Sequence, residues 1–250
     1  MAVSLPLLRH LVTLLDLTKL DDDTSAADVE RLCQAATTPL GKVAAVCIPP
    51  EHVKLAVRLL AGSGIKVATV ANFPGGGQMV DSVVAEVSQV VAAGADEIDL
   101  VLPYRALLLD QPEQADAMVR AVRAACAGKV LKVILETGEL HSPTRIRLAS
   151  ELALAAGADM LKTSTGKVKV GATPEAARVM LQVIASKGGK AGIKYSGGVR
   201  SVEQALDYLN LTAELWPERP LYSSAIRIGA SALIADILRR APVDQIKRGS

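Results

Sequence analysis

Short apolar runs alternate with helical patterns along the chain, at a spacing of about 25 to 35 residues. The apolar runs predict eight strands, over residues 14–18, 43–48, 66–71, 97–102, 131–136, 160–164, 192–196 and 226–229. The stretches between them carry apolar residues at helical spacing and predict helices over 25–36, 51–61, 80–93, 112–127, 143–156, 174–187 and 202–209. Strict alternation of strand and helix predicts a parallel sheet with right-handed crossovers.

Eight such units without a long linker favour an α/β fold of one particular kind. The 250 residues are enough for a single (β/α)8 barrel, the TIM barrel, as one domain over 1–250 with a short N-terminal helix. A doubly wound open sheet is the alternative architecture.

An internal repeat sets the register of two strands. The phrase Ala-Gly-Ala-Asp occurs at 93–96 and again at 156–159, each time between a predicted helix and a predicted strand. Asp99 and Lys162 each follow the Asp of their repeat by three positions. Their strand neighbours Ile98 and Leu161 are apolar and should face the helices, so the strand period of two turns Asp99 and Lys162 into the barrel.

Other strands also carry polar side chains at inward positions. Asp16 and Thr18 alternate with leucines on the first strand, Cys47 lies between Val46 and Ile48, and Lys194 follows Ile193. A buried charge costs several kcal/mol unless it is paired. We therefore interpret the inward charges as a catalytic site rather than a structural ion network.

The turns after the last three predicted strands are rich in glycine. They read Ser164-Thr165-Gly166-Lys167, Ser196-Gly197-Gly198-Val199-Arg200 and Gly229-Ala230-Ser231. Glycine lets backbone N–H groups approach an anion, and barrel enzymes often bind phosphate in the loops of these strands. Together the three turns predict a phosphate site.

Two inward lysines on adjacent strands indicate one type of chemistry. A lysine amine is a nucleophile only when it is neutral, and its ordinary pKa is about 10.4. Burial and a second cation, here Lys194, would lower the pKa of Lys162. Asp99 could then move protons. The arrangement predicts a Schiff-base site for making or breaking a C–C bond beside a carbonyl.

Motifs along nearly the whole chain resemble the deoxyribose-phosphate aldolase family, in the order of that family. They are Asp16-Leu17-Thr18, Cys47-Ile48, Asn72-Phe73-Pro74, Asp96-Glu97-Ile98-Asp99 with Pro103-Tyr104-Arg105, Glu136-Thr137-Gly138-Glu139-Leu140, Lys162-Thr163-Ser164-Thr165-Gly166-Lys167, Gly197-Gly198-Val199-Arg200 and Gly229-Ala230-Ser231. The resemblance implies a class I aldolase that cleaves 2-deoxy-D-ribose 5-phosphate to D-glyceraldehyde 3-phosphate and acetaldehyde, in deoxyribonucleotide catabolism, without a metal or cofactor.

The resemblance also implies roles for single residues. Lys162 would be the Schiff-base lysine, Lys194 the second lysine and Asp99 the proton-relay acid. The residues implied to hold the phosphate are Gly166, Lys167, Gly197, Gly198 and Ser231, and those implied at the aldehyde end are Asp16, Thr18 and Cys47. Thr165 and Gly229 are expected to bind the substrate as well. Tyr195 and Ala232 depart from the family pattern, and we expect Tyr195 to point away from the barrel interior.

Composition narrows the remaining classes. The net charge is +2, from 28 basic and 26 acidic residues, and the aromatic residues are one Phe, one Trp and four Tyr. These values argue against a nucleic-acid binder. Neither a signal peptide nor a membrane-spanning run is evident, and Cys33, Cys47 and Cys126 form no paired motif, so we expect a cytoplasmic protein with reduced thiols and no membrane partner.

Several other functions remain possible beside that of a deoxyribose-phosphate aldolase. His10, His52 and His141 are isolated, which disfavours a metal-dependent aldolase or hydrolase. A different lysine aldolase, a sugar-phosphate isomerase on the same barrel and an inactive phosphosugar-binding regulator stay open. The expected partners are phosphosugar and aldehyde substrates, and the expected assembly is a homodimer, with a tetramer as the alternative.

Overall fold

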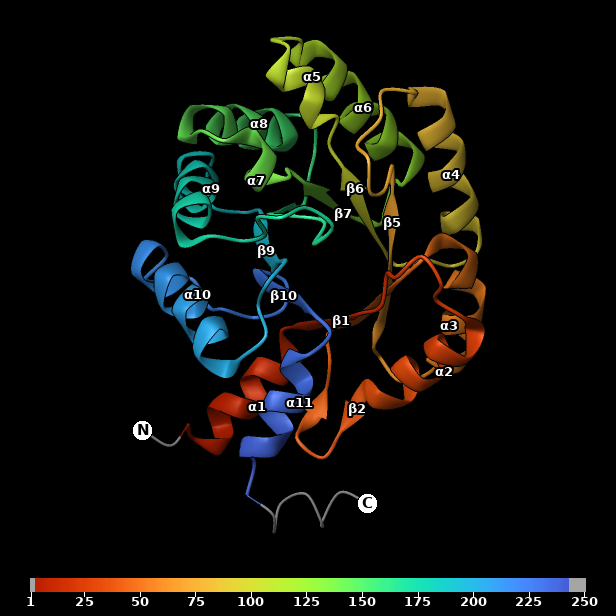
Figure 1. Cartoon of the computed structure of the whole chain (residues 1–250), viewed down its shortest axis with the longest axis vertical. Helices are drawn as coiled ribbons and strands as arrows, with labels where there is room; N and C mark the ends of the chain where they lie inside the picture. Colours follow the sequence, from red (N-terminus) through yellow and green to blue (C-terminus); the bar gives the residue numbers. More distant parts are fainter. Residues whose placement is uncertain (1–2, 243–250) are drawn as a thin grey trace.

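Eight parallel strands close into a barrel in the computed structural model, which describes residues 3–242 (Figure 1). Residues 1–2 and 243–250 of the expected domain lie outside the described residues. The barrel strands, in their order around the barrel, are β1 (Leu15–Thr18), β4 (Ala45–Ile48), β5 (Lys66–Ala71), β6 (Glu97–Val101), β7 (Val130–Ile134), β8 (Met160–Lys162), β9 (Gly192–Ser196) and β10 (Ile226–Ala230), which pairs again with β1. The predicted closed barrel is confirmed, and the open sheet is not observed.

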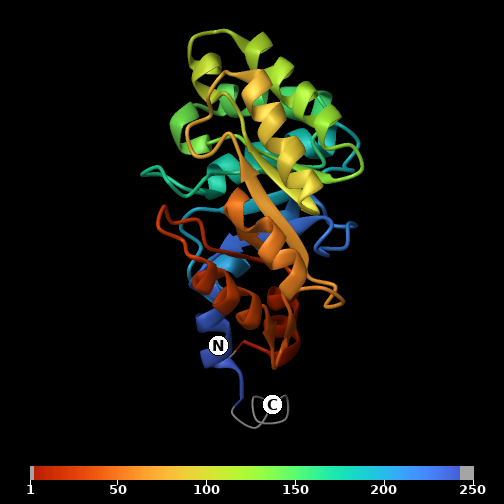
Figure 2. The same cartoon turned by 90° about the vertical axis from the view of Figure 1, so that its right-hand side faces the viewer.

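Helices surround the strands on the outside of the barrel (Figure 1). In chain order they are α1 (Leu5–Thr13), α2 (Ala26–Ala35), the 3-10 turn η1 (Pro50–His52), α3 (Val53–Leu59), α4 (Val80–Ala92), α5 (Tyr104–Leu108), α6 (Pro112–Ala125), α7 (Thr137–Leu140), α8 (Pro143–Ala155), α9 (Pro174–Ser186), α10 (Val202–Leu215) and α11 (Leu233–Arg240). The predicted N-terminal helix is α1, and it packs beside α11 at one end of the molecule in both views (Figure 2).

Local sequence signals explain where several helices begin. The hydroxyls of Ser142 and Thr173 accept hydrogen bonds from the backbone N–H groups of Arg145 and Ala176, and a proline follows each cap. A capping hydroxyl satisfies one of the free N–H groups of the first turn, and proline lacks an N–H that would need a partner there. These caps fix the start of α8 and α9 directly after the loops that line one end of the barrel.

Apolar side chains form two separate clusters, one outside the strands and one inside the barrel. Outward strand residues such as Leu161, Ile193 and Ile228 are fully buried against the helices. Inside, on β4 and β5, a small apolar cluster forms from Ala45, Cys47, Ala68 and Val70. Many of the other inward positions carry charged side chains, and these carry the candidate chemistry described below.

Several elements differ from the sequence prediction. The hairpin β2 (Thr37–Thr38) and β3 (Gly41–Lys42), the short helices α5 and α7, and the helix α11 were not predicted as such, and α10 extends to Leu215 rather than to residue 209. The two strands of the hairpin, α5 and α7 contain at most five residues each, which is too short to show a helical or strand period. In α10 the buried faces of Leu211 and Thr212 continue the helix.

Candidate active site

A cavity of about 400 Å³ opens at the carboxyl ends of the strands. It lies where the barrel fold places its active sites. Nine of the residues expected at the site line this cavity: Thr18, Lys162, Thr165, Gly166, Lys167, Gly197, Gly198, Gly229 and Ser231. Lys162 lies at the end of β8, so its side chain reaches the cavity from inside the barrel.

Lys162 is a buried lysine with a lowered pKa. Its residue is 2% exposed, and its Nζ lies 2.7 Å from Asp99 Oδ2. Burial lowers the pKa of Lys162, the charge of Lys194 lowers it further, and the carboxylate of Asp99 opposes both without cancelling them. A larger fraction of this amine is therefore neutral than in an ordinary lysine.

Asp99, on β6, is shared by three lysines. Its Oδ2 accepts hydrogen bonds from Lys162 and Lys194, each at 2.7 Å, and its Oδ1 accepts one from Lys132 at 2.8 Å. Burial alone would raise the pKa of Asp99, but the three lysine charges hold it well below its ordinary range. Asp99 is thus an anion that touches both predicted lysines.

Lys194 lies next to Lys162 but has the opposite pKa shift. The two residues are paired across β8 and β9, as the sequence predicts. Burial alone would lower the pKa of Lys194, but Asp16, at 2.5 Å, and Asp99 raise it. Lys194 therefore stays a cation at the pH at which Lys162 loses its proton.

Three further buried ions were not predicted from the sequence: Glu97, Lys132 and Arg227. Lys132 Nζ lies 2.5 Å from Glu97 Oε2, and Arg227 contacts Glu97 at 2.7 Å and Asp16 at 2.6 Å. The same signal that identified Asp99 could have found them. Glu97 lies two positions before Asp99, and Lys132 and Arg227 each stand between apolar strand neighbours.

These side chains form one ionic cluster, which consists of Asp16, Glu97, Asp99, Lys132, Lys162, Lys194 and Arg227. With every group ionised it holds four positive and three negative charges. A neutral Lys162 balances the cluster, which is the state that a low-dielectric interior favours. The composition of the cluster thus agrees with the lowered pKa of Lys162.

The three residues expected at the aldehyde end occupy different depths. Thr18 lines the cavity. Cys47 is fully buried, and its Sγ lies 3.9 Å from Asp99 Oδ2, while burial raises the pKa of the thiol. Asp16 is also fully buried and lies beneath the cavity rather than on its wall. Burial alone would raise its pKa, but Lys194 and Arg227 lower it.

Glycine turns and basic side chains form the opposite wall of the cavity. Gly197 and Gly198 have φ of +84° and +95°, which favours glycine, and Gly197 lies so close to Gly171 that a Cβ on Gly171 would be 2.1 Å from the Gly197 oxygen. Lys167 is at the exposed rim, where its Nζ lies 3.6 Å from an Asp22 oxygen. Arg200 also lines this wall and was not assigned a role from the sequence.

Glu136 fixes the loop that follows β8. Its carboxylate accepts hydrogen bonds from the Thr165 backbone N–H at 3.1 Å and from the Thr165 hydroxyl at 2.6 Å. Burial raises the pKa of Glu136, and the hydrogen bonds from Thr165 oppose that shift. Thr165 in turn accepts a hydrogen bond from the Lys167 N–H at 3.0 Å, so Glu136 positions the backbone that carries Lys167.

Tyr195 points away from the barrel interior, as expected. Its hydroxyl lies 2.7 Å from Thr212 Oγ1, and its ring stacks on Tyr208 with centroids 4.4 Å apart. Tyr195 therefore packs β9 against α10 and does not enter the cavity. Ala232 lines the cavity beside Ser231 and adds no hydroxyl there.

Within residues 3–242, no three His, Cys, Asp or Glu side chains come together in a way that could hold a metal ion. No helix in that part of the chain is long and apolar enough to cross a membrane.

The fold and the site together define an α/β-barrel aldolase. Residues 11–216 match the model of the DeoC/LacD family aldolases, and the chain belongs to this family. It is an enzyme, a lyase of the aldolase type with small-molecule substrates.

Solved structures of similar proteins agree with this family. A protein from Coccidioides immitis designated a deoxyribose-phosphate aldolase is 31% identical over 93% of this chain and 86% of its own, with a TM-score of 0.83. The apo form of a protein from Toxoplasma gondii ME49 with the same designation is 26% identical over 94% of this chain and 96% of its own, with a TM-score of 0.86. The tetrameric deoxyribose phosphate aldolase of Aeropyrum pernix is 27% identical over 93% of this chain and 91% of its own, with a TM-score of 0.77.

Proposed function

We propose that this aldolase cleaves 2-deoxy-D-ribose 5-phosphate reversibly to D-glyceraldehyde 3-phosphate and acetaldehyde, through a Schiff base on Lys162. The observation that carries the proposal is the lowered pKa of Lys162 at a cavity whose opposite wall is built from glycine turns and Lys167. The first feature suits attack on an aldehyde, and the second suits a phosphate. The names of the similar structures support the same substrate.

The reaction begins at the C1 aldehyde of the open-chain sugar. The neutral amine of Lys162 adds to C1, and loss of water leaves a protonated imine. Removal of the proton from the C3 hydroxyl then breaks the C2–C3 bond, which releases glyceraldehyde 3-phosphate and leaves its electron pair in an enamine. Protonation of the enamine at C2 and addition of water to the imine release acetaldehyde and restore Lys162.

Asp99 and Lys194 would assist these reaction steps by stabilising charge and transferring protons. The protonated imine places a positive charge near the position of the Lys162 ammonium, which is 2.7 Å from Asp99 Oδ2. The carboxylate can therefore stabilise the imine without moving. Asp99 Oδ2 also accepts a hydrogen bond from Lys194, so a proton can pass between Lys162 and Lys194 through this shared oxygen.

The phosphate would lie against the glycine turns. Lys167, Ser231 and the backbone of Gly197 and Gly198 line the wall away from the ionic cluster. Binding energy gained there orients the sugar over Lys162. In the cell, the enzyme would serve deoxyribonucleotide catabolism in the cytoplasm, as a homodimer or, like the Aeropyrum pernix protein, a tetramer.

A product assay in the presence of a metal chelator tests the proposal. The enzyme should convert 2-deoxy-D-ribose 5-phosphate to acetaldehyde and glyceraldehyde 3-phosphate in equal amounts, and Lys162→Leu should abolish the conversion. Lys54→Leu, which removes an exposed lysine of α3, is the matched control and should be fully active. Formation of an isomeric pentose phosphate, or loss of activity in chelator, would contradict the proposal.

A further inference from the structure

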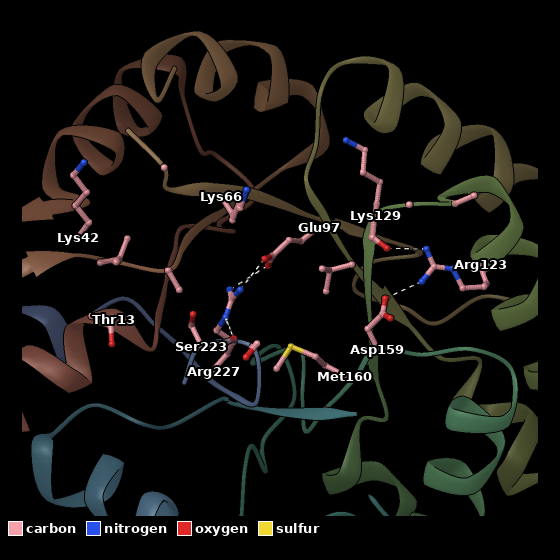
Figure 3. A pocket seen from close by; sticks show the side chains of 17 residues that line it. Thr13, Lys42, Lys66, Glu97, Arg123, Lys129, Asp159, Met160, Ser223 and Arg227 are labelled. Carbon is pink, nitrogen blue, oxygen red and sulfur yellow. Dashed lines mark hydrogen bonds and ion pairs between the residues drawn. The ribbon is translucent and has the colours of Figure 1, made fainter. Parts of the chain in front are cut away.

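A second cavity, called the lower cavity here, opens at the amino ends of the strands, at the opposite end of the barrel from the candidate active site. Its volume is about 980 Å³, larger than that of the candidate active site, and it is lined by residues at or just before the amino ends of the strands (Figure 3). Cavities of about 300 to 1,000 Å³ hold small organic ligands. In the aldolase reaction proposed above, no step uses this end of the barrel.

The lining of this lower cavity is strongly basic. Lys42, Lys66, Lys129, Arg123 and Arg227 line it together with two carboxylates, Glu97 and Asp159. Both carboxylates are already paired, Asp159 with Arg123 at 2.8 Å and Glu97 with Arg227 at 2.7 Å. The three lysines have no carboxylate partner among the described residues, so this one cavity holds an excess of three positive charges in a chain whose net charge is +2.

Arg227 forms the inner end of the cavity and has a donor to spare. Its Nε donates to the Ser223 oxygen, its Nη1 to Asp16 and Glu97, and its Nη2 to Glu97. A guanidinium carries five N–H groups, so one hydrogen of Nη2 has no partner among the described contacts. Arg227 is 6% exposed and lines the cavity, where Figure 3 shows it at the centre beside Glu97.

The walls between the charges are apolar. Val43, Ala44, Val130 and Met160 line the cavity beside Arg227. An apolar wall with a guanidinium donor at its inner end and lysines around it suits a small molecule that carries several anionic oxygens on a compact body.

We propose that the lower cavity is a second anion site, which takes a small phosphorylated or multiply carboxylated metabolite. Lys66 and Lys129 would attract the ligand at the mouth, and the free N–H of Arg227 would contact one of its oxygens. This site is distinct from the phosphate wall at the carboxyl ends of the strands.

A ligand in this cavity would act on the catalytic lysine through charge. Arg227 contacts Asp16, and Asp16 contacts Lys194, which adjoins Lys162. An added negative charge at Arg227 favours the protonated form of Lys162, so the ligand should inhibit most strongly at low pH. This coupling rests on the proposed aldolase function, whereas the binding itself does not.

Calorimetric titration with pyrophosphate, without any substrate, tests the binding. The Lys167→Met variant, which weakens the phosphate wall at the carboxyl ends of the strands, should still bind one pyrophosphate. Adding Lys66→Gln and Lys129→Gln to it should weaken this binding about 10-fold or more. Adding instead Lys54→Gln and Arg58→Gln, which remove two exposed charges of α3, should leave the affinity unchanged.

Equal affinity in the two multiple variants would overturn the site, since binding would then depend on overall charge alone. The coupling between the lower cavity and Lys162 has its own test, in which the Lys167→Met enzyme acts on unphosphorylated 2-deoxyribose. Pyrophosphate should move the acid limb of kcat/KM to higher pH, and the Lys66→Gln/Lys129→Gln change should remove this shift. Binding without any shift would overturn the coupling. Binding can be measured whether or not the chain cleaves deoxyribose 5-phosphate, so the two proposals can fail separately.

Discussion

At the scale of single residues, the site depends on two adjacent lysines with opposite pKa shifts. Lys194 has Asp16 and Asp99 within 2.7 Å, and these carboxylates outweigh its burial. Among the described residues, Lys162 has only the Asp99 carboxylate at that distance, and burial together with the charge of Lys194 prevails. The difference of one carboxylate therefore separates the proposed nucleophile, Lys162, from its proposed supporting cation, Lys194.

Removal of the supporting cation should change the pH profile. In Lys194→Leu the charge that lowers the pKa of Lys162 is gone, so that pKa rises and less of the amine is neutral at a given pH. The acid limb of kcat/KM should move to higher pH by about one unit or more. Lys54→Leu should keep the wild-type profile. An unchanged acid limb with an unchanged rate would make Lys194 a bystander.

The inward direction of Asp99, Lys162 and Lys194 could be predicted from the sequence, because it follows from strand alternation and, for the first two, from the repeated Ala-Gly-Ala-Asp phrase. The roles of Lys132, Glu97 and Arg227 could not be derived in that way. Alternation can place them inside, but which carboxylate each cation meets depends on the stagger between strands distant in sequence. Arg227 and Asp16, for instance, are 211 positions apart. Closure of the barrel brings them together.

At the scale of elements, the loop after β8 carries the proposed phosphate side of the site. Glu136, at the end of β7, holds Thr165, and Thr165 holds the backbone of Lys167. The strands and long helices of this region could be predicted from period and capping. The short helix α7, which begins beside Glu136, could not, because four residues show no period.

The proposed phosphate role of Lys167 predicts a substrate-dependent loss. A charge-assisted contact contributes about 1.5 to 3 kcal/mol, so Lys167→Met should lower kcat/KM on deoxyribose 5-phosphate roughly 10- to 150-fold. Activity on unphosphorylated deoxyribose should change little, because that substrate lacks the group. Equal losses on both substrates would show that Lys167 serves the chemistry or the fold.

The positioning role of Glu136 predicts a difference between two substitutions. Glu136→Ala removes both acceptors of Thr165 and should raise KM for deoxyribose 5-phosphate, by about 10-fold for the lost hydrogen bonds. Glu136→Gln keeps an oxygen for the Thr165 N–H and should retain most of the affinity. If the two variants had the same KM, Glu136 would not position the loop.

At the scale of the whole molecule, the barrel holds seven ionised or ionisable groups where most proteins hold apolar side chains. Each carboxylate of the ionic cluster contacts at least two cations, which offsets the cost of burial. Arg227 contacts both Asp16 on β1 and Glu97 on β6, two strands that are not neighbours in the barrel. The cluster therefore links the strands as well as serving the site.

The cluster should be sensitive to the loss of any one partner. Arg227→Met leaves Asp16 and Glu97 with fewer counter-charges and should lower the free energy of unfolding by about 3 to 5 kcal/mol. For a chain of this size the melting temperature should fall by at least about 6 °C. Arg58→Met, on the exposed face of α3, should have no measurable effect. A loss below about 1 kcal/mol in Arg227→Met would mean that the cluster adds little to stability.

The most direct test of the account is to trap the proposed Schiff base. The enzyme is incubated with acetaldehyde and borohydride, digested, and its lysines are mapped by mass spectrometry. Lys162 should carry an added two-carbon group, because it is the lysine with the lowered pKa at the cavity. A label on Lys167 or Lys194 with Lys162 unmodified would contradict the central assignment.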